Sequence, residues 1–181
     1  MADINSQQAT QITQFASTRM GQQVGDGECF TLVDQALRGA GARSAASYGT
    51  ITPEANYVWG RAITVGQAQA GDVIQFSNYR YVKRVTTKIV RRDGSEEESF
   101  TEVEQSRPHH TAIVAILEGQ GAVTVLEQNV EGVRRVSRQG LFFTSLSAPP
   151  VISIDAGGTS TTVTTVITVS GQSRFYRPET P

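Results

Sequence analysis

The chain contains the residue types of a thiol nucleophile and its base. Cys29 is the only cysteine in 181 residues, and the only two histidines, His109 and His110, are adjacent. A thiol becomes an effective nucleophile when a base within hydrogen-bond reach takes its proton and a third group orients that base. A single cysteine excludes an internal disulfide and a multi-thiolate zinc site. The chemistry to look for is therefore nucleophilic catalysis at Cys29.

Cys29 stands at the predicted start of a helix. Apolar side chains follow it at three- and four-residue steps until Gly39 and Gly41 interrupt the pattern. A helix N-terminus carries partial positive charge and free backbone N–H groups, which favour a thiolate over a thiol. Glycines just upstream would let the backbone turn sharply and admit a substrate. The alternative is a buried cysteine on a packing helix.

The base and the residue that orients it are expected on two neighbouring strands. His109 and His110 begin an apolar strand and must point to opposite faces, so we expect His110 to be the base and His109 to be exposed or at the rim. Residues 122–129 form the returning strand of a hairpin, which places Glu127 and Asn129 opposite the start of the His110 strand and on one face. We expect Glu127 to orient His110. The alternative is an acidic residue at a strand end.

The negative oxygen of a tetrahedral intermediate needs donors placed beforehand. The backbone N–H of Cys29 is the expected first donor, and Gln23, six residues earlier, is the candidate for the second. Gln23 could equally be a loop residue without a role. A metal site made from the cysteine and both histidines is disfavoured because adjacent strand residues diverge. No metal and no cofactor are expected.

The order of elements predicts an α+β fold in which N-terminal helices pack on an antiparallel sheet of six to seven strands. Residues 4–21 have a loose helical spacing, with Asn5 or Ser6 as a cap, and residues 43–59 form a loop that could line a cleft. Alternating or β-rich segments predict the strands, at 70–76, 79–89, 99–104, 109–117, 122–129, 151–154 and 161–169.

Two segments lie outside this plain pattern. The Asp93-Gly94 pair predicts a tight turn in a projecting β-hairpin at about 79–104, inserted before the histidine strand. Its mixed charges indicate a ribbon with both faces in solvent. The alternative hypothesis is an arm that binds a protein partner. We expect it to shape substrate access and to contribute little to the core. The Ser/Thr-rich region 145–177 predicts further strands, and 161–169 is either one long exposed strand or a flexible excursion.

Four short motifs in order resemble those of CHAP domains, the cysteine, histidine-dependent amidohydrolases and peptidases of the papain-like/NlpC-type fold. The motifs are Gly27-Glu-Cys29-Phe-Thr-Leu-Val, Ala70-Gly-Asp-Val-Ile-Gln-Phe76, His110-Thr-Ala-Ile-Val and Val125-Leu-Glu127-Gln-Asn129. The resemblance implies Cys29 as nucleophile, His110 as base, Glu127 as orienting residue and Asn129 as a supporting polar residue. Thr31 and His109 depart from the family pattern, which puts the substrate in doubt more than the chemistry.

The resemblance implies cleavage of amide bonds in bacterial cell-wall peptidoglycan through an acyl-enzyme. The alternatives are a protein-glutamine deamidase or acyltransferase using the same residues, and a catalytically silent binding module. The 16 basic and 17 acidic residues give a formal charge of −1, so neither nucleic acid nor a membrane is an expected partner. We expect a single domain over residues 1–181, without a signal peptide and made in the cytoplasm, and release or delivery to the cell wall stays open.

Overall fold

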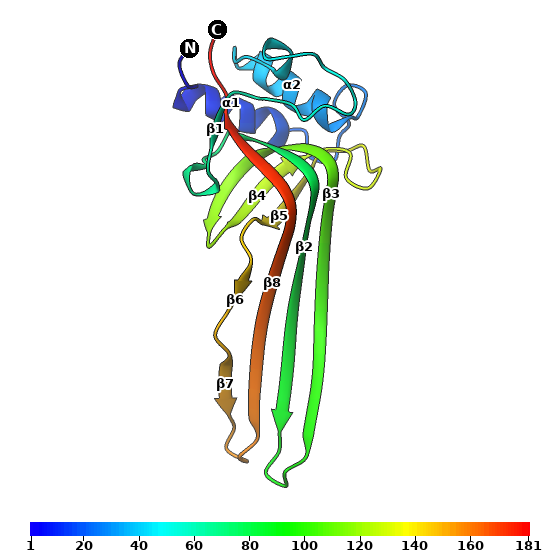
Figure 1. The fold of residues 1–181 in the computed structure, drawn as a ribbon, viewed down its shortest axis with the longest axis vertical. Coiled ribbons are helices and arrows are strands. Elements are labelled where there is room, and N and C mark those ends of the chain that lie inside the picture. Colours follow the sequence, from blue (N-terminus) through cyan, green and yellow to red (C-terminus); the bar gives the residue numbers. More distant parts are fainter.

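The computed structural model describes residues 1–181 as a head that carries the helices and a long arm that extends from it (Figure 1). We call residues 80–105 and 145–170 the arm and the rest the head. The helices are α1 (Ser6–Ser17) and α2 (Cys29–Gly39), with short 3-10 turns η1 (Ala45–Ser47) and η2 (Val65–Gln67). The strands are β1 (Arg61–Ile63), β2 (Val73–Val90), β3 (Glu96–Gly119), β4 (Ala122–Glu127), β5 (Ser137–Phe142), β6 (Leu146–Ser147), β7 (Val151–Ile154) and β8 (Ser160–Arg177).

The two helices begin where the sequence predicts. Asn5 is the N-cap of α1, where its side chain and that of Gln8 bond to each other's backbone N–H in a capping box. Helix α2 starts at Cys29 and ends at Gly39, as the apolar spacing predicted. Neither helix has the length and apolarity that a membrane-spanning helix requires.

All eight strands belong to one antiparallel sheet in the order β1-β8-β2-β3-β4-β5, with β6 and β7 also paired to β8. The predicted α+β fold is confirmed, with one strand more than the upper estimate. Alternate residues of the strands enter two cores, because successive side chains point to opposite faces. Ile113 packs with the helices, through Leu32 and Leu37, whereas Ala112 belongs to a second core on the other face.

The arm corrects the predicted hairpin. Strand β2 runs unbroken from Val73 to Val90 and pairs with β3 as far as Glu96, so the separate strands predicted at 70–76 and 79–89 are one. Strand β8 pairs with the other side of β2 along the same length, which makes segment 160–177 one long strand. The arm is therefore an extension of the central strands, rather than a two-stranded insertion bounded by residues 79 and 104.

The head meets the arm at a β-bulge. Asn78 has a φ of 51° and Gly171 a φ of 77°, and the pairing of β2 with β8 shifts between Ser77 and Arg80. The extra residue interrupts the alternation of faces, so Phe76 and Tyr79 are both buried in the second core although they are three residues apart. A bulge here changes which side chains enter the head.

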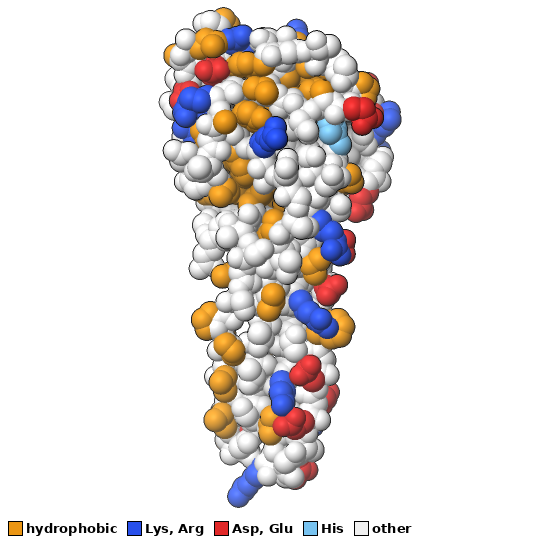
Figure 2. Space-filling view, viewed as in Figure 1, with side chains coloured by type: hydrophobic (Ala, Val, Ile, Leu, Met, Phe, Trp, Pro, Cys, Tyr) orange, Lys and Arg blue, Asp and Glu red, His pale blue; other side chains and the backbone are white.

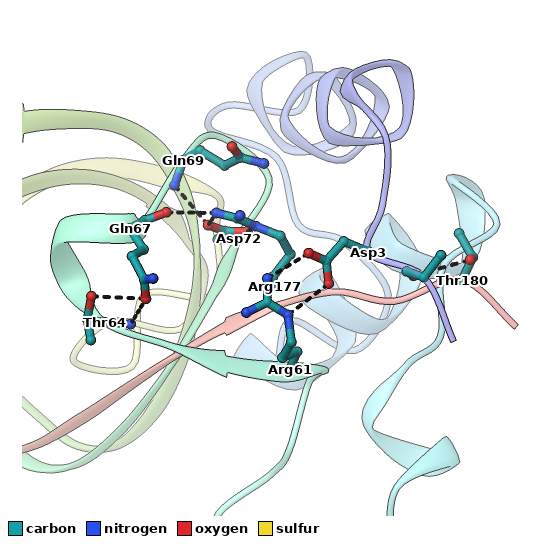
Figure 3. A network of polar contacts seen from close by, with 9 residues as sticks. Asp3, Arg61, Thr64, Gln67, Gln69, Asp72, Arg177 and Thr180 are labelled. Carbon is teal, nitrogen blue, oxygen red and sulfur yellow. Dashed lines mark hydrogen bonds and ion pairs between the residues drawn. The ribbon is translucent and has the colours of Figure 1, made fainter.

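Polar contacts near both chain ends tie the C-terminal strand to the start of β2 and the N-terminal segment to β1 (Figure 3). Arg177 donates from Nε and Nη2 to the buried carboxylate of Asp72, at 3.1 and 2.9 Å, and Asp72 also accepts from the N–H of Gln69 at 2.8 Å. Arg61 forms a two-pronged ion pair with Asp3 beside it. The Gly-Asp motif noticed in the sequence thus anchors the C-terminal strand.

Gly171→Ala should destabilise the protein by roughly 2 kcal/mol or more, because it combines a left-handed backbone with a backbone clash. A Cβ at this position would lie 1.9 Å from the carbonyl oxygen of Asn78. Gly140→Ala is the matched control in the same sheet, since nothing lies within 4 Å of its added Cβ. Urea unfolding measures both variants, and equal free energies of unfolding would contradict the strained junction.

Candidate active site

Cys29 is the first residue of α2 and opens onto a cleft of about 380 Å³, which we call the thiol cleft. The thiol is partly exposed, so the alternative of a cysteine sealed in the core is wrong. Ile51, Pro53 and Tyr57 line the cleft, as expected for the 43–59 loop.

Cys29 and His110 line the same cleft, and each of the two groups shifts the pKa of the other. Burial raises the pKa of the thiol, but the bond and charge of His110 and the backbone N–H groups of Thr111 and Phe30 outweigh it, so the pKa lies below its usual value. Burial lowers the pKa of His110, and its bonds to Cys29 and Glu127 raise it above the usual value. The two shifts together favour a thiolate beside an imidazolium.

Glu127 lies on the other side of the imidazole. Its Oε2 is 3.0 Å from Nε2 of His110, which leaves Nδ1 as the ring nitrogen available to the thiol. Burial raises the pKa of the Glu127 carboxyl, and the bonds to His110 and Arg107 lower it below the usual range. Cys29, His110 and Glu127 therefore form one continuous line, the arrangement expected from the sequence.

Arg107 completes this line and was not predicted. Its Nη2 and Nε donate to Oε1 and Oε2 of Glu127 at 2.6 and 2.9 Å, and the two side chains are 2% and 0% exposed. Strict strand alternation places residues 107 and 110 on opposite faces, yet both contact Glu127. The irregularity opposite Pro108, where Asn78 has no partner on β3, is the local reason. No signal in the sequence pointed to this role, because the burial of Arg107 is visible only in the structure.

Asn129 does not share a face with Glu127, so that prediction is wrong. Strand β4 ends at Glu127, and Asn129 has a φ of 63°, which turns its side chain to Glu28, where Nδ2 donates to Oε2 at 2.7 Å. Between them, the buried Gln128 side chain bonds the carbonyls of Val24 and Glu28 and accepts from the Val24 N–H. Gln128, missed in the sequence, thereby holds the loop that leads into Cys29.

The structure does not bring Gln23 to the thiol. Its exposed side chain donates to the carbonyl of Gly25 at 3.1 Å, and it is absent from the cleft lining. The backbone N–H of Cys29, at a helix start where it has no intrahelical partner, keeps the position expected of an oxyanion donor. His109 lies at the rim as expected, with Nε2 2.7 Å from the carbonyl oxygen of Ala55. No three His, Cys, Asp or Glu side chains are grouped to hold a metal ion.

A second cleft of about 300 Å³ adjoins the thiol cleft, next to where the arm begins. His109, His110 and Asn129 line both clefts, while Arg107 and Glu131 line only the second. The imidazole therefore stands where two hollows meet.

Comparison with known families places this geometry in context. Residues 1–148 match the family model described as the AIM3/BBC1 Cysteine proteinase-fold domain. No curated protein and no solved structure gave a match. The family confirms the cysteine proteinase fold expected from the motifs, and it does not single out the CHAP branch that they resemble.

The lowered pKa of Cys29 predicts fast alkylation below the usual thiol range. The rate with iodoacetamide rises with the thiolate fraction, so the midpoint of the rate-against-pH curve should lie below the value of about 8.5 found for a free cysteine. In His110→Ala the midpoint should move upward, because burial of the thiol then lacks its main opposing influence. Mass spectrometry of the labelled protein measures the rate. Identical curves for the protein, the variant and a short cysteine peptide would contradict activation.

The Arg107–Glu127 pair predicts unequal costs for single and double changes. Arg107→Met or Glu127→Gln alone should each lower the free energy of unfolding by about 3 kcal/mol or more, since each leaves a buried group without its partner. The double variant should lose less free energy of unfolding than the two single variants together. Alkylation of Cys29 should be slow in Glu127→Gln, and it should stay slow in the double variant. Urea unfolding and alkylation are the two measurements, and additive losses of stability would show that the pair is not coupled.

Proposed function

Because the chain belongs to the family of AIM3/BBC1 cysteine proteinase-fold domains, we propose that it is a cysteine hydrolase that cleaves amide bonds. The observation that carries the proposal is the continuous line from Cys29 through His110 to Glu127 at the edge of an open cleft. A buried thiol or a diverging histidine would have left the fold without this chemistry.

The reaction follows from the order of these groups. The thiolate of Cys29 attacks the amide carbonyl carbon, and the oxygen becomes negative beside the backbone N–H at the helix start. When the tetrahedral intermediate collapses, the C–N bond breaks and the His110 imidazolium gives its proton to the leaving amine. Water then attacks the thioester, His110 takes the proton of that water, and the acid and the thiol are released.

Arg107 and Glu127 act through the histidine. The guanidinium keeps Glu127 ionised, and the bidentate contact holds the carboxylate in one orientation. An ionised Glu127 accepts the Nε2–H of His110 and so keeps Nδ1 directed at the thiol. In this proposal, Glu127 and Arg107 are positioning residues.

The substrate class rests on the resemblance to CHAP domains, which implies stem peptides of bacterial peptidoglycan. The two clefts that meet at His110 support a substrate that extends on both sides of the scissile bond. No residue of the arm lines the second cleft, which is bordered by Ser106–Pro108 of the head, next to the start of the arm. The arm tip near Gly94 is roughly 45 Å away at the usual rise of a strand, so we limit the proposed influence of the hairpin on access to its base.

Hydrolysis should depend on Cys29 and His110 and not on the neighbouring histidine. Purified peptidoglycan and an unfolded protein such as casein are the two test substrates, with fragments identified by mass spectrometry. Cys29→Ala and His110→Ala should lower turnover by roughly a thousandfold or more. His109→Ala is the matched control and should stay within about tenfold. The proposal would be contradicted if Cys29→Ala kept its activity on both substrates. Equal losses of activity in His109→Ala and His110→Ala would also contradict it.

A further inference from the structure

The two outer edges of the arm differ in character. Strand β3 forms one edge and carries acidic side chains toward the tip, namely Glu96, Glu97, Glu98, Glu102 and Glu104. Strand β7 forms the other edge and contains no charge, and its Val151, Ile152 and Ile154 are 68%, 64% and 71% exposed. Apolar side chains line this edge of the arm in Figure 2. Charged residues protect sheet edges from pairing with other chains, so only the β7 edge lacks such protection.

The outward backbone groups of β7 belong to the two exposed isoleucines. The N–H of Asp155 donates to the carbonyl of Thr159 across the turn, and β7 continues the pairing with Ser153 opposite Thr161. In an antiparallel pair, every second residue directs both backbone groups at its partner strand. Ser153 therefore faces β8, whereas Ile152 and Ile154 present their N–H and C=O groups to solvent.

We propose that a second copy of this chain pairs with β7 through its own β7, antiparallel and with Ser153 on the two-fold axis. In this register Ile152 of each copy faces Ile154 of the other, and both are residues with outward backbone groups. Each such pair forms two hydrogen bonds and brings two exposed isoleucine side chains together on one face of the sheet. The inference concerns the arm alone and is independent of the proposed hydrolase activity.

A second copy fits this edge for three reasons. The register is self-complementary, as an isologous two-fold contact requires. The uncharged strand would desolvate glutamates if it paired with the β3 edge, and two β3 edges would repel each other. Antiparallel pairing near the tips also points the two heads in opposite directions, which leaves the thiol clefts open. Because the strand is short, the dimer should be weak and should depend on protein concentration.

Cross-linking at Ser153 tests the register directly. Ser153 lies on the axis, and its backbone N–H and C=O groups face away from the second copy. Ser153 and its counterpart therefore form a non-hydrogen-bonded pair with Cα atoms about 4.5 Å apart. Such a separation suits a disulfide. Ser153→Cys in a Cys29→Ala background should form a disulfide-linked dimer on mild oxidation. Ser99→Cys in the same background is the matched control, because Ser99 is an exposed residue on the β3 edge. Non-reducing electrophoresis measures the dimer.

Sedimentation provides the second measurement on the full chain. The unmodified protein should shift from monomer to dimer as its concentration rises, and Ile152→Lys should remove that shift while leaving the circular dichroism spectrum unchanged. A monomer at every concentration, with no excess of Ser153→Cys dimer over the control, would overturn the proposal and leave the edge to a strand of a different protein. The proposal would also be overturned if Ile152→Lys still formed a dimer and Ser153→Cys formed no disulfide-linked dimer, since the contact between the two copies would then lie outside β7.

Discussion

The buried carboxylate of Glu127 is the group on which both the fold and the site depend. A charge with no exposed surface is costly unless it is paired and hydrogen-bonded. Arg107 and His110 satisfy it from β3, while Glu127 itself ends β4. Any slip of β3 along β4 would separate these groups, so the ion pair and the strand register require each other. The orientation of His110 toward Cys29 is thus set by the same contacts that hold the sheet in register.

The site lies where the sheet changes from a packed layer to an exposed ribbon. Above the bulge at Asn78, the central strands pack between helices and an aromatic core. Below it, Tyr81 and Ile167 are still buried, and the side chains toward the tip of the arm are partly or fully exposed. Arg107 precedes Pro108 and His110 follows it by two positions at this level of β3. The local loss of regular alternation allows both side chains to reach one carboxylate. The feature that ends the packed head thereby also shapes the candidate active site.

The sequence predicted what depends on short-range patterns. The helical spacing after Cys29 and the hairpin that pairs β3 with β4 are local, and they predicted Cys29 at a helix start and Glu127 opposite the His110 strand. The pairing of Cys29 with His110 came from the residue types and the motif resemblance. Departures from regular backbone geometry could not be seen in this way. A positive φ turned Asn129 aside, and the irregularity at Pro108 concealed Arg107. The matching family model supports a cysteine proteinase fold and does not distinguish the CHAP branch.

The pairing of β2 with β8 has a consequence for how the protein is made. Val73 pairs with Tyr176 and Val90 with Ser160, so β2 lacks one whole neighbour until residues far along the chain are available. Contacts between such distant segments slow folding, because a long loop must close before they contribute. During synthesis, Cys29 and His110 leave the ribosome well before β8 does. The nascent chain therefore carries Cys29 and His110 for some time before the sheet that aligns them can be completed.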